Sequence, residues 1–349
     1  MTIDKLPSYD DILKTLNSKG RKKHLLLGNG FSIAYDSKIF SYNALNTFIN
    51  DLEDEILKKL FSIIKTKDFE TVMQQLNNFC EIAGAFGPNK RLVSKIKKAS
   101  ENLKKNLIEA VKELHPEHVF KIPDEKQASC IKFLREYIDN DGEIFTTNYD
   151  LLLYWVLMRG DSKNAIDGFG RDRENEADEY VEEDELEYSE LRWGKHKEDQ
   201  NIHYLHGALQ IFDAGTEIIK EEYDTQNYLL DKIQARLKKK EYPIFITAGN
   251  GKEKLTHINH NKYLTFCFEK LCSIEGSLVV FGFGFSEYDD HIIKAINIAA
   301  KMGKRSGNKL FSVYIGVFSE KSLKYIETIK DQFKCKVNLF DARRVKVWS

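Results

Sequence analysis

The sequence lacks the features that mark metal-ribbon, nucleic-acid-binding and membrane proteins. Its five cysteines, at positions 80, 130, 267, 272 and 335, form no Cys-x-x-Cys pair, so their spacing predicts neither a zinc ribbon nor a disulfide framework. Its 53 basic and 54 acidic residues nearly cancel, which argues against nucleic acid or an anionic membrane as a partner. No apolar run approaches the roughly 18 residues of a membrane span, and no targeting segment is apparent at the N-terminus. We expect a cytoplasmic protein with no direct nucleic-acid binding and no membrane association.

The 349 residues are enough for a large core. Short apolar runs that end in glycine or serine start near residues 24, 242, 277 and 310, and helical segments lie between several of them. Buried strands that alternate with helices are typical of a parallel sheet with crossover helices. The sequence therefore predicts an α/β fold, with a Rossmann-like parallel sheet flanked by helices and formed by residues 1–40 and 136–349.

Two segments do not fit this alternating pattern. Residues 41–135 carry apolar side chains at spacings of three and four, which predicts a large helical insertion. Residues 170–192 are crowded with acids, and a block of like charge is typical of a solvated, flexible loop. We interpret the first as a subdomain and the second as a surface loop.

Glycine pairs follow two of the predicted strands. Gly28 and Gly30 form either a plain tight turn or a cradle whose backbone N–H groups approach a phosphate. The dinucleotide fingerprint would require a third glycine where Ile33 stands. Gly282 and Gly284 repeat the arrangement, and there Ser286 is expected to cap the following helix with Asp289 three residues later.

Polar residues follow two other predicted strands. Thr147, Asn148 and Asp150 could cap a helix, or Asn148 and Asp150 could face a ligand rich in hydroxyl and amide groups. His203 and His206 would lie on opposite faces of a strand or on one face of a helix. His206 has the stronger claim to a catalytic role because its neighbour, Gly207, leaves room for a substrate. No third ligand joins the two histidines at a suitable spacing, so we expect no metal.

Four segments, in order, resemble the motif series of the sirtuin superfamily: GNGFS at 28–32, TTNYD at 146–150, HYLHG at 203–207 and GFGFSEYD at 282–289. Sirtuins carry Gly-Ala-Gly-hydrophobe-Ser, then Thr-Gln-Asn-Ile-Asp, then His-Gly, then a glycine and serine loop. The likeness is greatest to bacterial sirtuin-like proteins of phage defence, many of which hydrolyse NAD. It covers roughly residues 20–40 and 140–349 and leaves the helical insertion unexplained.

The resemblance implies roles for residues that match the motifs. Asn148 would contact the nicotinamide ribose and a catalytic water, Asp150 would recognise the carboxamide, and His206 would act as the base. The pyrophosphate loop would comprise Gly28, Asn29, Gly30, Phe31 and Ser32. The other residues expected to bind NAD are Thr147, Tyr149, Gly282, Gly284, Ser286 and Asp289, the last four on the loop that meets the adenosine half. Phe31 and Tyr149 depart from the small or aliphatic residues usual in the family.

The expected function is hydrolysis of NAD, as substrate, to ADP-ribose and nicotinamide. The resemblance further implies a regulated effector of bacterial antiviral defence, controlled by assembly into a homo-oligomer or by a partner such as a HerA-like ATPase. Two alternatives stay open. One is a non-catalytic regulatory module that binds NAD or ADP-ribose, and the other is a protein deacylase, which the missing zinc ribbon disfavours.

Overall fold

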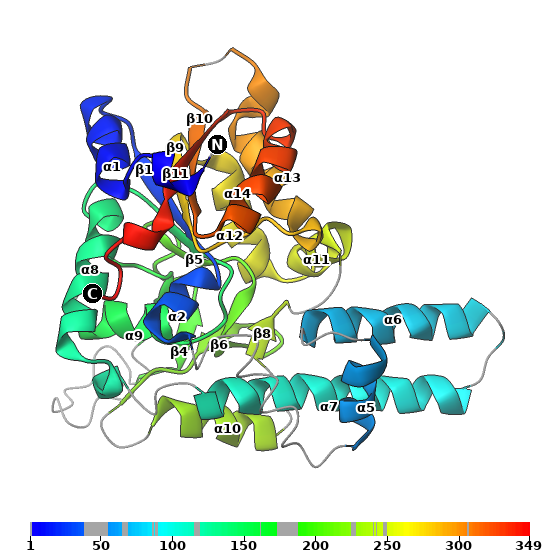
Figure 1. Cartoon of the computed structure of the whole chain (residues 1–349). Coiled ribbons are helices and arrows are strands. Elements are labelled where there is room, and N and C mark those ends of the chain that lie inside the picture. Colours follow the sequence, from blue (N-terminus) through cyan, green and yellow to red (C-terminus); the bar gives the residue numbers. More distant parts are fainter. Residues whose placement is uncertain are drawn as a thin grey trace, which may run out of the picture.

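The computed structural model (Figure 1) describes most of the chain. The described residues are 2–37, 55–64, 69–85, 87, 90–114, 119–160, 162–172, 188–224, 228–239, 241, 243–246, 250–305 and 307–349. Most of the acidic stretch expected as a flexible loop, residues 173–187, therefore lies outside the described residues. Among the helices of these ranges, none combines the length and the apolar character needed to cross a bilayer.

A parallel sheet of six strands forms the centre of the described chain, in the order β11-β10-β9-β1-β2-β5. Every neighbouring pair in it is parallel, which confirms the predicted Rossmann-like α/β fold. The strands are β1 (Lys23–Leu27), β2 (Ile144–Thr146), β5 (Ile202–Tyr204), β9 (Gly276–Phe281), β10 (Leu310–Val317) and β11 (Lys336–Asp341). All residues of β1 and β9 are buried, because helices cover both faces of the sheet, and both strands are therefore mostly apolar.

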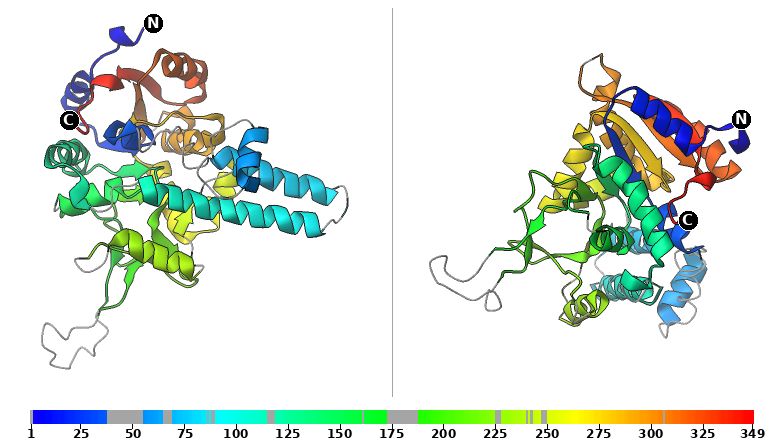
Figure 2. Two further views of the ribbon diagram at one scale, coloured as in Figure 1. Left: turned by 60° about the horizontal axis from the view of Figure 1, so that its bottom comes forward. Right: turned by 90° about the vertical axis from the view of Figure 1, so that its left-hand side faces the viewer.

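The covering helices lie between the strands in sequence and on both sides of the sheet in space (Figure 2, right). They include α1 (Tyr9–Ser18), α2 (Gly30–Tyr35), α8 (Asp124–Ile138), α9 (Leu152–Arg159), α11 (Gly251–Asn259), α12 (Lys262–Ser273), α13 (Asp290–Ala299) and α14 (Glu320–Ile329). Helix α8 packs on β1 and β2, α12 on β5, and α14 on β10. Helices α11, α12 and α13 also contact one another, so they form one layer.

The sequence predicted that the apolar run near residue 242 belongs to the parallel sheet, and this prediction is wrong. Its strand β8 (Pro243–Phe245) belongs to a second, antiparallel sheet of the order β3-β4-β7-β6-β8. The other strands are β3 (Phe169–Gly170), β4 (Leu191–Trp193), β6 (Gly207–Asp213) and β7 (Ile218–Lys220). The chain leaves β5 through a tight turn into β6, and β8 then pairs with β6. The composition of a short buried strand does not indicate which strand it pairs with, so composition alone assigned β8 to the wrong sheet.

Helices α5 (Glu55–Ile64), α6 (Phe69–Ala85) and α7 (Lys90–Leu114) occupy the predicted insertion and pack against each other. In Figures 1 and 2 (left), α6 and α7 project sideways from the sheet domain. The following short helix η2 (Val119–Lys121) contacts α9, and α8 contacts β1 and β2. The expected boundary between residues 135 and 136 thus falls inside α8, a helix that packs on the central sheet.

The strand order reverses between β1 and β9. From β1 the chain moves outward to β2 and β5, and it then returns to the opposite side of β1 as β9, followed by β10 and β11. In open α/β sheets, ligands bind outside the carboxyl ends of the strands at such a reversal. The glycine pairs at residues 28–30 and 282–284 follow the two strands that flank it.

Candidate functional site

The two glycine loops touch each other at the reversal point. Gly28 N–H donates to the carbonyl of Phe281, and Gly30 N–H donates to the carbonyl of Gly282 at 2.8 Å. A Cβ atom on Gly30 would lie 2.5 Å from the Cα atom of Gly282, whose φ of +74° is itself in the left-handed region. Glycine is therefore required here by backbone contact between the loops, whether or not a phosphate binds.

Three polar side chains link the ends of β1 and β2, and we call Ser32, Asn148 and Asp150 the oxygen cluster. The Asn148 side-chain amide donates to the carbonyl of Gly28 and to Ser32 Oγ, both at 3.0 Å. Ser32 Oγ, fully buried, donates to Asp150 Oδ2 at 2.5 Å. The cluster brings together residues from two predicted motifs that are more than a hundred positions apart.

Both oxygens of the Asp150 carboxyl accept hydrogen bonds from the protein. Its Oδ1 atom accepts a hydrogen bond from Leu152 N–H at the start of α9, so it satisfies an end of that helix. Its other oxygen binds Ser32. Burial raises the pKa of the Asp150 carboxyl, and the hydrogen bonds from Ser32 and Leu152 offset part of that rise. The predicted contact of Asp150 with a carboxamide stays a prediction. In this structure both carboxyl oxygens accept hydrogen bonds from the protein.

His206 lies in the turn between β5 and β6, next to the oxygen cluster's segment. Leu205 N–H donates to the carbonyl of Thr146, and Leu209 N–H donates to the carbonyl of Tyr149. These bonds hold the TTNYD segment and the turn of His206 side by side. Tyr149 thus contributes a backbone atom to the junction, and Thr147 adds a bond from its N–H to the carbonyl of Leu27.

The side chain of His206 points to a partner that the sequence had not singled out. Its Nε2 atom lies 2.8 Å from Nε2 of His291 in α13, and the two rings stack at an interplanar angle of 26°. Asp289 is close by, and its Oδ1 atom pairs with Lys254 Nζ of α11 at 3.2 Å. We call His206, His291, Asp289 and Lys254 the imidazole cluster.

Both histidines of this cluster are held neutral by their surroundings. Burial lowers the pKa of His206 well below its ordinary value, and the nearby His291 and Lys254 lower it further. Burial likewise lowers the pKa of His291, an effect that Asp289 opposes. At neutral pH each ring therefore carries one N–H and one nitrogen lone pair, and in the bond between the two Nε2 atoms the lone pair of one ring accepts the N–H of the other.

The remaining predicted site residues fall into different environments. Asn29, Gly284 and Ser286 are exposed on the two loops, whereas Phe31 is buried against Trp348, whose indole N–H donates to the Phe31 carbonyl. Ser286 was expected to cap the next helix, but its side chain makes no capping hydrogen bond. Its hydroxyl instead donates to Asp289 Oδ2 at 2.6 Å, because a short 3₁₀ turn, η4 (Glu287–Asp289), precedes α13.

Sequence reasoning missed two residues of the imidazole cluster, His291 and Lys254. His291 stands two positions after Asp289 at the start of a helix, and that proximity to a glycine loop was the available signal. Lys254 carried no such signal in the sequence, because a single lysine in a helical segment is usually exposed to solvent. His203, the other predicted histidine, is buried in β5 beside Glu143 and does not join the cluster.

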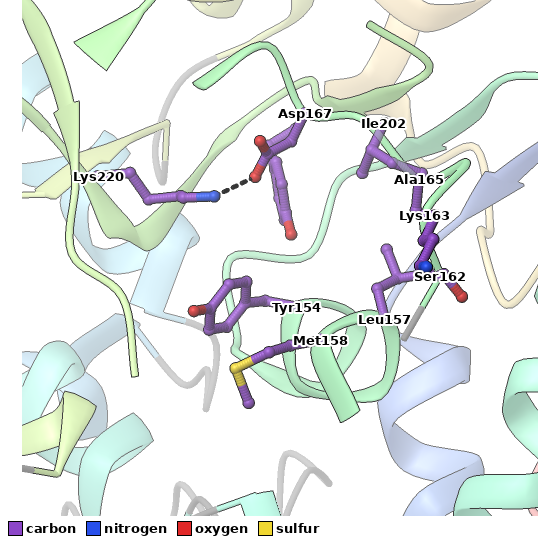
Figure 3. Close-up of a pocket in the computed structure, with 10 residues that line it drawn as sticks. Tyr154, Leu157, Met158, Ser162, Lys163, Ala165, Asp167, Ile202 and Lys220 are labelled. Atoms are coloured by element: carbon purple, nitrogen blue, oxygen red, sulfur yellow. Dashed lines mark hydrogen bonds and ion pairs between the residues drawn. The ribbon is translucent and has the colours of Figure 1, made fainter. Parts of the chain in front are cut away.

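A cavity of about 250 Å³ lies elsewhere, lined by residues of α9, of the segment that follows it, of β5 and of β7 (Figure 3). Tyr154, Met158 and Tyr204 contribute to its wall, and Lys220 pairs with Asp167 at 2.5 Å at one side. None of the predicted NAD-binding residues lines this cavity. It is therefore separate from the two clusters at the carboxyl ends of the strands.

Comparison with known proteins identifies the family of the chain without assigning an activity. A family model described as a domain of unknown function, DUF4917, matches residues 25–348. No curated protein matches the sequence. The chain therefore belongs to the DUF4917 family, and the match runs from within β1 through the helical insertion and the rest of the sheet domain.

Proposed function

We propose that this protein hydrolyses NAD to ADP-ribose and nicotinamide at the carboxyl ends of β1, β2, β5 and β9. The observation that carries the proposal is the meeting of four separate motifs at one edge of the sheet, where the strand order reverses between β1 and β9. Short side chains that orient a ribose and a neutral imidazole both occur at that edge.

The chemistry fits the groups present. When the bond between the ribose C1′ and the nicotinamide nitrogen breaks, its electron pair leaves with neutral nicotinamide, and the sugar acquires oxocarbenium character. A water oxygen then bonds to C1′, and its proton passes to a base. His206 serves as that base because its ring is neutral near pH 7.

Asn148 is the residue that can orient the ribose and the water. Its hydrogen bonds within the described residues use the side-chain nitrogen and the backbone N–H, which leaves the side-chain oxygen for a ligand. The residue is half-buried, whereas Asp150 and His206 are buried. Asp150 acts in the proposal through Ser32 and Asn148, as a positioning residue for the loop that follows β1.

Nicotinamide release from NAD by the purified full chain tests the proposal. His206→Ala should lower the rate by about 10²- to 10⁴-fold, the range of a lost general base. Asn148→Ala, which removes the orientation of the ribose and the water, should lower it by about 10²-fold. His257→Ala, an exposed histidine on α11, is the matched control and should keep the wild-type rate. Urea unfolding of each variant separates lost chemistry from lost structure. Wild-type rates in both site variants would refute the assignment.

One observation favours a second candidate, a regulatory module that binds NAD or ADP-ribose without turnover. His206 and Asp150 are both buried and already hydrogen-bonded to protein partners, so neither offers an open contact to substrate in this structure. Calorimetry with NAD distinguishes the candidates. Tight binding without nicotinamide release, unchanged in His206→Ala, would establish the module and exclude the hydrolase. A deacylase would instead require NAD-dependent turnover of an acylated peptide.

Control by self-assembly is the further part of the proposed function. Helices α5 and α6 of the insertion expose Ile63, Phe79 and Ile82, and exposed apolar side chains of this kind favour a protein contact. Light scattering after size exclusion should show a homo-oligomer that Ile63→Glu and Ile82→Glu dissociate. A monomer at every concentration would count against it. The role in antiviral defence and the HerA-like ATPase rest on the motif resemblance.

A further inference from the structure

The imidazole cluster brings three metal-binding groups together from two separate parts of the chain. The Nε2 atoms of His206 and His291 face each other at 2.8 Å, and one donor atom from each of His206, Asp289 and His291 lies within 4.8 Å of the others. In tetrahedral zinc sites each nitrogen lies about 2.0–2.1 Å from the metal, which places two such nitrogens about 3.3 Å apart. A small opening of the histidine pair would therefore admit an ion.

The donor set is that of a borderline transition metal. Two imidazoles and one carboxylate suit Zn²⁺ and its neighbours, whereas Mg²⁺ and Ca²⁺ prefer oxygen ligands alone. Both rings are buried, and a neutral imidazole is the form that binds metal. Three protein ligands would leave the fourth position of a tetrahedron for water.

The surroundings already orient these donors. The carbonyl of His206 accepts a hydrogen bond from Ile246 N–H, which fixes the turn that carries the ring. The His291 ring stacks on His206 on one side and lies near the Phe268 ring, nearly parallel to it. Asp289 receives hydrogen bonds from Ser286 and Lys254 on its two oxygens. Such outer contacts are how proteins orient metal ligands.

We propose that His206, Asp289 and His291 form a binding site for a divalent transition metal ion of the Zn²⁺ class. This departs from the expectation of no metal, because His291 and Asp289 supply the ligands that the sequence pattern around His203 lacked. The site stands independently of NAD cleavage. The ion would bind His206 Nε2, the atom that faces His291. A His206 ring that holds the ion there cannot accept a proton at the same atom during NAD cleavage.

Lys254 provides a specific signature for the site. Its ammonium group is buried beside Asp289 and repels a cation bound there. Replacing it by an uncharged residue of similar length, Lys254→Met, should therefore tighten metal binding by about tenfold or more. A cluster that served only to join helix and turn would show no such gain.

Titration of the metal-stripped full chain with Zn²⁺ tests the proposal, with Co²⁺ as a spectroscopic probe. One ion should bind per chain, and Co²⁺ should give visible absorption of a tetrahedral site. His291→Ala and Asp289→Asn should weaken binding beyond the roughly 10- to 100-fold typical of a lost outer contact. His257→Ala should bind normally. Thiol alkylation should leave binding unchanged, which excludes the partly exposed cysteines at 80, 272 and 335.

Binding that is absent in the wild type, or equal in wild type and His206→Ala/His291→Ala, would overturn the metal site. Circular dichroism identifies any variant that fails to fold, and Asp289→Asn then carries the test because it preserves shape. Nicotinamide release is measured on the metal-stripped protein before Zn²⁺ is added, because a bound ion would block His206. A chain that binds Zn²⁺ but never cleaves NAD keeps the metal site and refutes the proposed hydrolase, whereas cleavage without Zn²⁺ binding does the opposite.

Discussion

The two polar clusters at the carboxyl edge of the sheet differ in how completely the protein satisfies them. In the oxygen cluster Ser32, Asn148 and Asp150 bond to one another, to the Gly28 carbonyl and to the Leu152 amide. In the imidazole cluster two neutral rings share one hydrogen bond, and the Nδ1 atom of buried His291 has no partner among the described residues. Buried polar atoms are normally paired, so an unpaired one needs an explanation.

This difference separates structural from ligand-binding tasks. The oxygen cluster ties the loop after β1 to the loop after β2, so a substitution there changes the shape of the site as well as any contact with substrate. The imidazole cluster has donor atoms that the fold does not use fully. We therefore expect substitutions of Ser32 and Asp150 to act mainly on stability, and substitutions in the second cluster to act mainly on ligand binding. Asn148 differs from its two partners, because its side-chain oxygen is left for a ligand.

The largest stability effect is expected for Gly30→Ala, beneath the oxygen cluster. The new Cβ atom would meet the Gly282 backbone at 2.5 Å, and backbone cannot move aside as a flexible side chain can. The free energy of unfolding should fall by about 3 kcal/mol or more, measured by urea denaturation, because a clash with backbone lies at the upper end of the cost of overpacking. Gly284→Ala, on the second loop, is the control, since nothing lies within 4 Å of its added Cβ.

Metal titration of the same variant sharpens the contrast between the clusters. Gly30→Ala should bind Zn²⁺ with wild-type affinity if the imidazole cluster is built from β5, α11 and α13 without the first glycine loop. Equal losses of stability in the two glycine variants would contradict the close contact of the loops.

A pair of serines compares the clusters directly. Ser32 Oγ donates to Asp150 at 2.5 Å and is buried, while Ser286 Oγ donates to Asp289 at 2.6 Å and is exposed. Ser32→Ala should lower the free energy of unfolding by about 1.5–3 kcal/mol, because it removes a buried hydrogen bond to a charged group. Ser286→Ala should change it by less than about 0.5 kcal/mol. Similar effects would show that burial does not distinguish the two bonds.

The sheet could be predicted from sequence because buried parallel strands leave a direct trace. The runs of β1, β9 and β10 are mostly apolar and are followed closely by glycine or serine, so their number and order indicated an α/β fold. The run of β8 has the same composition, but it pairs with β6 in the antiparallel sheet. Pairing depends on where the chain turns, which the composition of one strand does not record.

The site was predictable to the extent that its residues follow strands. Asn148 and Asp150 come directly after β2, and His206 lies two residues after β5, so each had a positional signal. His291 and Lys254 reach the cluster through the packing of α13 and α11, which no local pattern encodes. Nor could the sequence indicate that Ser32, which is expected in the pyrophosphate loop, would also donate a hydrogen bond to Asp150.

The smallest expected effect is a pH dependence of stability that arises from Asp150. Burial raises the pKa of this carboxyl, so the folded state binds its proton more tightly than the unfolded chain does. The native protein is therefore favoured as the pH falls from the raised pKa toward the ordinary value of about 3.9. Asp150→Asn keeps the shape and removes the titration. The wild type should gain stability relative to this variant between pH 7 and pH 4, measured by urea unfolding.

Asp11 supplies a control with the opposite sign. It accepts hydrogen bonds from Ser8 at the exposed start of α1, and these bonds lower the pKa of its carboxyl. A lowered pKa stabilises the fold above the ordinary value and loses that contribution as the pH falls, so wild type should lose stability relative to Asp11→Asn. Opposite pH dependences of the stability difference between wild type and the two variants would show that burial destabilises the ionised carboxyl of Asp150. Parallel slopes would mean that solvent reaches the oxygen cluster as freely as it reaches α1.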